Sequence, residues 1–183
     1  MSSKSLIIIP TYNERDNVNA IIDAILNLDD NFNLLIVDDN SPDGTADIVR
    51  GLQNRYQGRL HLESRKGKLG LGTAYIFGFK WALKRDYSFI FEMDADFSHN
   101  PEDLLRLLNQ CNNLGSDVAI GSRYVKGVNI VNWPMSRLLI SYFASKYVKM
   151  ITGMPIHDST AGFKCYKREV LEKINLDKIK FVG

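Results

Sequence analysis

FIFEMDAD, residues 89–96, is a largely apolar run that ends in two aspartates separated by one residue. A run of this length and composition is typical of a strand that is buried on both faces of a sheet. Side chains alternate along a strand, so Asp94 and Asp96 can point the same way where the chain leaves the sheet. The stretch therefore predicts a buried strand that brings a pair of acids to one edge of a sheet.

Outward from this stretch, strand and helix signals alternate along the first two thirds of the chain. Apolar runs predict further strands at residues 6–9, 34–37, 60–62 and 117–120. Apolar residues at helical spacing predict helices at residues 18–28, 46–56, 73–84 and 104–108. Asn100 followed by Pro101 is a good start for the last of these helices. Such alternation predicts an α/β fold with a doubly wound, mostly parallel sheet flanked by helices.

Polar or glycine-rich segments follow all five predicted strands. Ligands of doubly wound sheets bind outside the carboxyl ends of the strands, so these segments are expected to form one site. The segments are residues 10–14, 38–45, 65–72, 94–96 and 121–124.

The acid pair Asp94 and Asp96 favours a metal site. Two carboxylates held together repel unless a proton or a cation lies between them. A hard divalent ion, Mg²⁺ or Mn²⁺, prefers oxygen ligands and substrate phosphates, and it can neutralise charge on a departing diphosphate. The alternative is a pair of turn or capping acids ahead of Asn100.

Three acids follow the predicted strand at residues 34–37. An acid in this position often forms a hydrogen bond to a ribose or a base. Asp38 or Asp43 can instead cap or support the turn. We expect that supporting role for one or two of the three acids Asp38, Asp39 and Asp43, and not for all of them. The next glycine-rich segment, residues 67–72, has neither the GxGxxG nor the Gly-Lys-Ser/Thr spacing of known phosphate loops. A mobile basic loop near phosphates and an ordinary loop both remain open.

A segment of another character runs from residue 133 to residue 154. Its apolar residues are interspersed with Arg137, Lys146 and Lys149, which suits a helix lying on an anionic membrane. A core-packing helix with a solvated basic edge is the alternative. Arg123 and Arg137 are candidate anion ligands because guanidinium groups match phosphate oxygens, with surface ion pairing as the alternative. His99, near the acid pair, is expected to be structural.

Length, charge and hydropathy limit the number of domains, the kind of partner and the relation of the chain to a membrane. The chain of 183 residues suggests one domain, and its net charge of +2 gives no argument for nucleic acid as a partner. No stretch approaches the roughly 20 apolar residues of a membrane-spanning helix, and no secretory signal is present. Cys111 and Cys165 lack metal-ligand spacing and are expected to be buried, unpaired thiols. We expect a protein at the cytoplasmic face of a membrane, bound peripherally.

Seven strings, spread along the chain from residue 10 to residue 172, carry a resemblance to a known family. They are PTYNE (10–14), VDDNSPDGT (37–45), RKGKLGLGTAY (65–75), MDADFSHNP (93–101), GSRYVKG (121–127), WPMSR (133–137) and DSTAGFKCYKREVLE (158–172). In this order they resemble the inverting family 2 glycosyltransferases, most closely the polyprenol-phosphate (dolichyl-phosphate) mannosyltransferases.

The resemblance implies a GT-A nucleotide-sugar-binding fold, GDP-mannose as donor, a divalent ion and a polyprenyl (dolichyl-type) phosphate acceptor. It implies that Asp94, Asp96 and Arg123 are catalytic, and that Asp94, Asp96 and Ser98 hold the metal. Some relatives have glutamine at the position of Ser98. The implied donor site consists of Pro10, Tyr12, Glu14, Val37, Asp39, Asp94, Ala95, Asp96 and Arg123. The implied acceptor-phosphate site consists of Arg123, Arg137 and Ser141.

The resemblance also divides the single domain, residues 1–183, into two parts. Residues 1–125 are expected to bind the nucleotide sugar, and residues 126–183 to form an incomplete segment that faces the acceptor and the membrane. The family's domain continues past Gly183 with further strands and a basic residue over the donor, and membrane helices can follow. The family usually has Ser-Gly-Phe-Arg where this chain has Ala-Gly-Phe-Lys at 161–164.

Two alternatives stay open at this stage. One is a sister enzyme that uses UDP-glucose or another donor with the same lipid acceptor. The other is a nucleotide-sugar-binding module without catalysis, which the retained acid pair argues against. A nicotinamide-dependent oxidoreductase is disfavoured because the GxGxxG spacing is missing. The sequence names no protein partner.

Overall fold

The computed structural model describes residues 4–29, 31–122, 135–153, 158 and 161–179, with the side chains of helix α5 described from Phe143 onward. The strands are β1 (Ser5–Thr11), β2 (Phe32–Asp38), β3 (Leu60–Ser64), β4 (Phe89–Glu92), β5 (Val118–Ile120) and β6 (Lys164–Lys167). The helices are α1 (Arg15–Leu26), α2 (Thr45–Gln53), α3 (Leu71–Leu83), α4 (Asp103–Asn112), α5 (Met135–Thr152), α6 (Arg168–Lys173) and the 3₁₀ turn η1 (Leu176–Lys178).

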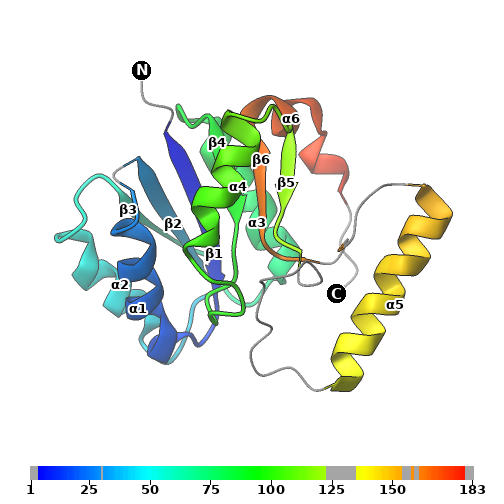
Figure 1. The fold of residues 1–183 in the computed structure, drawn as a ribbon. Helices are drawn as coiled ribbons and strands as arrows, with labels where there is room; N and C mark the ends of the chain where they lie inside the picture. The colour runs from blue at the N-terminus through cyan, green and yellow to red at the C-terminus, as the bar shows by residue number, and fades with distance from the viewer. Residues whose placement is uncertain (1–3, 30, 123–134, 154–157, 159–160, 180–183) are drawn as a thin grey trace.

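The strands form one sheet in the order β3-β2-β1-β4-β6-β5 (Figure 1). Strands β1 to β4 pair in parallel, and β6 runs antiparallel to both of its neighbours, β4 and β5. Strand β5 therefore points the same way as β1 to β4. This arrangement confirms the predicted α/β fold with a mostly parallel sheet.

Strand β6 was not predicted. Because it runs against the others, its first residue, Lys164, lies at the edge where β4 ends, opposite Glu92. The residues just before β6 therefore reach the same edge as the loops that follow the parallel strands.

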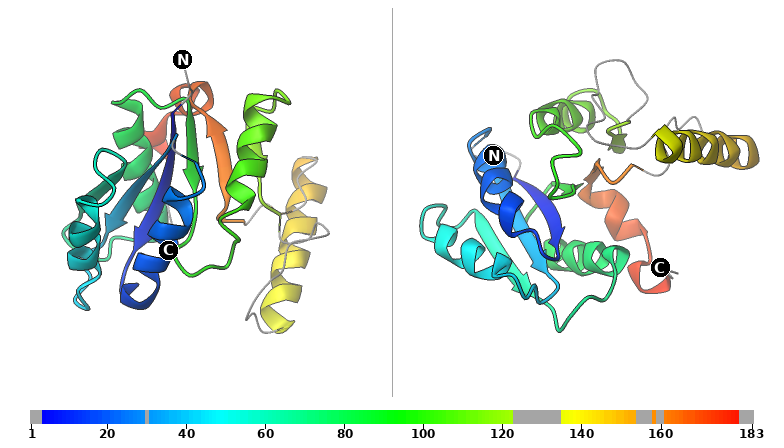
Figure 2. Two further views of the ribbon diagram at one scale, coloured as in Figure 1. Left: turned by 60° about the vertical axis from the view of Figure 1, so that its left-hand side comes forward. Right: turned by 90° about the horizontal axis from the view of Figure 1, so that it is seen from below.

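The two faces of the sheet bury separate apolar cores. Ile7 and Ile9 of β1 pack with residues of α1, α2 and α4, whereas Leu6 and Ile8 pack with residues of α3 and α6. This alternation is the period of two that a strand imposes. Figure 2 shows the helices on both sides of the sheet. The helices packed on both faces hold the carboxyl edge of the sheet in a fixed position.

Helix α5 lies to one side of the sheet in all three views (Figures 1 and 2). Four of its apolar side chains are exposed to solvent: Phe143 and Tyr147 at 62%, Ile151 at 66% and Met150 at 74%. They recur at helical spacing along one stripe. Packing of these four side chains into the core, one of the two expectations for this segment, is therefore wrong. Of the helices in the described ranges, none has the length and apolar content to cross a bilayer.

Candidate active site

Backbone strain gathers at the carboxyl edge of the sheet. The loops after β1, β2 and β4 each contain a residue other than glycine with a positive φ: Asn13 at 60°, Asn40 at 57° and Phe97 at 56°. Asparagine tolerates this region, but a bulky residue such as phenylalanine rarely adopts it. Conformations of this kind cluster at functional sites, where the surroundings hold them in place. The edge predicted to carry the site is therefore locally distorted.

A pocket of about 290 Å³ opens at this edge. Its lining comes from the loops after four strands and from the start of α3. The lining residues are Pro10, Thr11, Tyr12, Glu14, Asp39, Lys68, Gly70, Leu71, Ala74, Asp94, Ala95 and Asp96. The structure thus brings the acids at the ends of β2 and β4 into one pocket. Seven residues of the expected donor site line it.

The carboxylates of the acid pair are each held by a neighbour. Oδ1 of Asp94 accepts a hydrogen bond from the Tyr75 hydroxyl at 3.1 Å. Burial, and then the nearby carboxylates of Asp94 and Glu92, raise the pKa of Tyr75 well above its usual value of 10, so the phenol stays protonated and donates. Oδ1 of Asp96 accepts from the backbone N–H and the hydroxyl of Ser98, at 2.9 and 2.5 Å. Both acids are therefore oriented before any ligand binds.

The chemistry of this donor set fits a hard divalent ion. Within the described ranges, no group of three or more His, Cys, Asp or Glu side chains could enclose a metal. Asp94 and Asp96 instead offer a pair of carboxylates at the rim of a pocket, which suits Mg²⁺ or Mn²⁺ that keeps waters and substrate phosphates as ligands. The Ser98 hydroxyl donates to Asp96. Direct ligation by Ser98 stays a prediction.

The chain ahead of β6 packs against the first acid. A β-carbon placed on Gly162 would lie 2.9 Å from Oδ2 of Asp94. Sequence reasoning did not assign a role to Gly162 or Tyr75. Tyr75 lies in the string at 65–75 and Gly162 in the string at 158–172. Neither string shows which of its residues lies against the acid pair.

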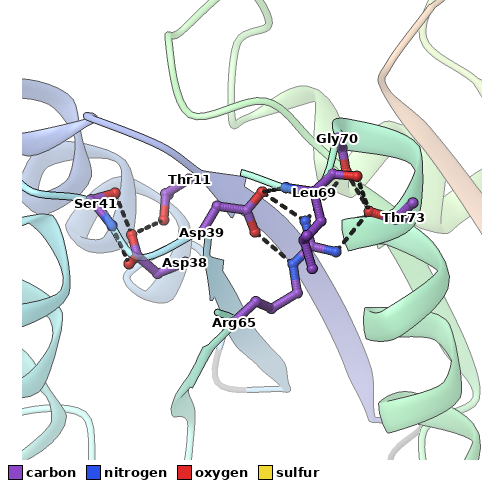
Figure 3. A network of polar contacts seen from close by, with 8 residues as sticks. All are labelled: Thr11, Asp38, Asp39, Ser41, Arg65, Leu69, Gly70 and Thr73. Atoms are coloured by element: carbon purple, nitrogen blue, oxygen red, sulfur yellow. Dashed lines mark hydrogen bonds and ion pairs between the residues drawn. The ribbon is translucent and has the colours of Figure 1, made fainter. Parts of the chain in front are cut away.

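Asp39 is joined to the loop after β3 by a buried ion pair (Figure 3). The Arg65 guanidinium donates from Nε to Oδ1 of Asp39 at 2.5 Å and from Nη2 to Oδ2 at 2.7 Å. Only 8% of the Asp39 side chain and 7% of the Arg65 side chain are exposed. Oδ2 of Asp39 also accepts from the backbone N–H of Leu69 at 3.2 Å, and Arg65 donates to the Thr73 hydroxyl at 2.8 Å. Asp39 thus fixes the glycine-rich segment beside the pocket.

The other two acids after β2 support turns, as expected. Asp38 accepts from the Thr11 hydroxyl at 3.0 Å and from the Ser41 hydroxyl at 2.6 Å. Asp43 accepts from the Thr45 hydroxyl at 2.6 Å, and this bond is the main cause that lowers the Asp43 pKa below its usual 3.8. These two acids shape the loop around Asp39.

Several expected site residues lie elsewhere or outside the described part. Val37 is fully buried in the core with α3, and its side chain does not line the pocket. Arg123 lies outside the described residues, as do the side chains of Arg137 and Ser141, whose backbone belongs to α5. His99 is 6% exposed and stacks on Phe163 with ring centroids 4.9 Å apart, which confirms a structural setting. Cys111 and Cys165 are buried and unpaired, as predicted.

Comparison with known proteins decides the family. The sequence pattern described as Glycosyl transferase family 2 matches residues 6–175. The chain belongs to glycosyl transferase family 2. It is therefore a glycosyltransferase, with the GT-A fold expected from its sequence.

Two curated relatives match this family 2 chain over almost its full length. One is a polyprenol monophosphomannose synthase of Mycolicibacterium smegmatis, 47% identical over 100% of this chain and 68% of that protein. Another is an undecaprenyl-phosphate mannosyltransferase of Micrococcus luteus, 42% identical over 97% of this chain and 72% of that protein.

Solved structures of other glycosyltransferases share the fold. A glucosyl-3-phosphoglycerate synthase of Mycobacterium tuberculosis, solved with Mn²⁺, UDP-glucose and phosphoglyceric acid, gives a TM-score of 0.67 at 16% identity over 92% of this chain. A Pyrobaculum calidifontis mannosyltransferase solved with GDP-Man and Mn²⁺ gives 0.63 at 20% identity over 93% of this chain. The family 2 chain spans 58% and 46% of those two chains.

Proposed function

We propose that the protein transfers mannose from GDP-mannose to a polyprenyl phosphate, with inversion at the anomeric carbon and with Mg²⁺ or Mn²⁺. The observation that carries the proposal is the pocket in which Asp39, Asp94 and Asp96 meet the loop after β1. Support for the substrates comes from the two curated relatives, one named as a synthase of polyprenol monophosphomannose and the other as an undecaprenyl-phosphate mannosyltransferase. GDP as the carrier rests on the family resemblance.

Within this proposal, the nucleoside lies against the loop after β1. Pro10, Tyr12 and Glu14 line that side of the pocket, and Asp39 lies beside them. Because the Asp39 carboxylate already accepts from Arg65 and Leu69, it acts with a fixed orientation. Val37 would contribute through its backbone, since its side chain is in the core.

We assign the acid pair, Asp94 and Asp96, to the divalent ion and the diphosphate of the donor. When bound there, the divalent ion supplies positive charge for the leaving GDP. Asp94 and Asp96 hold their orientation through Tyr75 and Ser98, and we assign the backbone of Ala95, which lines the same pocket, to a place beside the nucleotide. The new bond forms between an acceptor phosphate oxygen and the anomeric carbon, while the bond from that carbon to GDP breaks on the opposite side.

The acceptor needs no strong general base, because its phosphate is already an anion at neutral pH. Rate enhancement then rests on alignment of the two substrates and on charge stabilisation at the leaving group. We assign the acceptor phosphate to Arg123, Arg137 and Ser141, and residues 126–183 to the acceptor side of the domain. Residues 1–125 then form the donor side. Gly162, from the later segment, packs against Asp94 on that side.

The exposed face of helix α5 supports a membrane surface as the location that we propose for this acceptor side. Its exposed stripe of Phe143, Tyr147, Met150 and Ile151 lies next to the exposed Lys146 and Lys149. An apolar stripe with basic neighbours suits the interface of an anionic bilayer, where the lipid acceptor resides. We include in the proposal a peripheral location, with the cytoplasmic face taken from the expectation drawn from the sequence.

The test is mannosyl transfer by the complete protein, with Asp96→Asn as the variant and Asp47→Asn as the matched control on the exposed side of α2. The Asp96 variant should lose at least about 100-fold in activity, as expected when a group that stabilises the leaving charge is removed. The control should retain full activity. Near-normal transfer by the Asp96 variant would overturn the mechanism. Parallel assays with GDP-mannose and UDP-glucose decide the donor, and turnover with UDP-glucose alone would replace the proposed donor.

A further inference from the structure

The charges around the pocket are unevenly distributed. Glu14, Asp94 and Asp96 bring carboxylates, and the charge of Asp39 is already matched by Arg65. Of the lining residues in the described ranges, Lys68 alone has a basic side chain. A sugar nucleotide brings a diphosphate, an anion that a lysine ammonium recognises as a point charge.

Lys68 reaches across the mouth of this pocket. Its Nζ lies 4.7 Å from the centre of the Tyr12 ring, so a side chain from the loop after β3 meets one from the loop after β1. A cation–π contact at an exposed site is weak compared with a charge-assisted hydrogen bond to phosphate. The ammonium can therefore leave the Tyr12 ring for a phosphate oxygen without a large loss.

The backbone that carries Lys68 is fixed on both sides. Leu69, the next residue, donates its N–H to Asp39, and Arg65 bonds both Asp39 and the Thr73 hydroxyl at the start of α3 (Figure 3). Gly70 then turns the chain into α3 with φ 95° and ψ 145°, a conformation that essentially only glycine adopts. The loop therefore places Lys68 at the pocket in one defined position.

We propose that Lys68 is a donor-binding residue that contacts the diphosphate of the nucleotide sugar, and that Asp39, Arg65 and Thr73 position it. The inference rests on the proposed function and adds to it a phosphate contact from the loop after β3. The glycine-rich segment lacks the spacing of known phosphate loops, which left its function open. The proposal gives this segment the function of holding Lys68 near the diphosphate.

The experiment compares Lys68→Met with Lys66→Met. Lys66 lies in the same loop, is exposed and does not line the pocket, so its variant removes the same charge without the contact. Calorimetry with the complete protein and Mn²⁺ measures the affinities for GDP and for guanosine. Lys68→Met should weaken GDP binding by about 10-fold, the usual worth of a hydrogen bond to a charged group, and leave guanosine binding unchanged. Lys66→Met should change neither affinity, and Lys68→Arg should keep most of the GDP affinity.

Two results would overturn the proposal for Lys68 alone. One is equal weakening of GDP binding in the Lys66 and Lys68 variants, which would indicate a general effect of charge. The other is an equal loss for GDP and guanosine, which would indicate a disturbed loop. The affinities for UDP and uridine are measured in the same way. If the protein prefers UDP, the proposed donor is wrong, and the role of Lys68 is then tested by comparing UDP with uridine in place of GDP with guanosine. Failure of the wild type to bind either diphosphate would overturn both proposals.

Discussion

Gly162 lies so close to the Asp94 carboxylate that no side chain fits between them: a β-carbon on Gly162 would be 2.9 Å from Oδ2. The contact arises from the sheet topology. Strand β6 pairs with β4 in antiparallel register, Glu92 opposite Lys164, so the residues two steps beyond each strand also meet. A segment near the end of the chain thereby becomes a wall of the acid-pair site.

Gly162→Ala should reduce transfer on the order of 100-fold, because displacement of an aligned group by about 1 Å has this effect. The extra methyl group should also cost about 1–3 kcal/mol of unfolding free energy, as overpacking usually does. Steady-state transfer and a urea denaturation curve measure the two effects. Gly51→Ala on α2, where an added β-carbon meets nothing within 4 Å, is the control and should keep full activity. Full activity of the Gly162 variant would show that Asp94 can move without consequence.

Arg65→Met should destabilise the fold, since it leaves the buried Asp39 carboxylate without its cation. Loss of one partner of a buried pair costs about 3–5 kcal/mol, and Asp39→Asn combined with Arg65→Met should recover part of that loss. Urea unfolding of both variants provides the measurement. The exposed pair of Arg50 and Asp47 on α2 offers the comparison, and Asp47→Asn should cost about 0.5 kcal/mol or less. A loss below about 1 kcal/mol in Arg65→Met would contradict the structural role of the pair.

The extent of sequence-based prediction can be seen at these two sites. The strand that presents Asp94 and Asp96 was predicted, because apolar runs and side-chain alternation are local properties. The start of the following helix was predicted only approximately: α4 begins at Asp103 with Glu102 as its N-cap and no side-chain cap hydrogen bond, whereas Asn100 accepts the Glu102 N–H at 3.1 Å in the turn before the helix.

Contacts set by strand order could not be predicted in this way. Asp38 pairs with Ser64 in the register of β2 and β3, which places Asp39 beside Arg65. Neither segment shows that register by itself. Strand β6 has only four residues, too few for a clear period, and its place between β4 and β5 comes from tertiary packing. The contact of Gly162 with Asp94 depends on that packing, and the contact of Tyr75 with Asp94 depends on the packing of α3 against the sheet. The acids that meet in the pocket could therefore be named from the sequence, whereas the residues that hold them could not.

His61→Phe should remove part of the loss of stability in acid. Burial, and then the charge of Arg85, lower the His61 pKa below its usual 6.5. The unfolded chain therefore binds a proton at a pH where the folded chain does not, and the free energy of unfolding falls as the pH drops through that range. Phenylalanine keeps an aromatic ring against Trp81, whose ring centre is 4.9 Å away. Denaturation between neutral and mildly acidic pH should show a steeper fall for the wild type, and parallel curves would contradict this prediction.

Tyr147→Ser combined with Met150→Ser should weaken association with anionic vesicles by about 10-fold or more, since burial of each large apolar side chain contributes about 1.5–3 kcal/mol. Flotation with vesicles of phosphatidylglycerol in phosphatidylcholine measures the bound fraction. Leu114→Ser is the matched control, because Leu114 is 63% exposed like the α5 stripe but follows α4, at a distance in sequence from α5. If the α5 face inserts into the interface, only the double variant should lose binding, and added salt should weaken the wild type further by screening Lys146 and Lys149. Equal binding by the wild type and the double variant would separate α5 from the membrane and leave its exposed stripe to another partner.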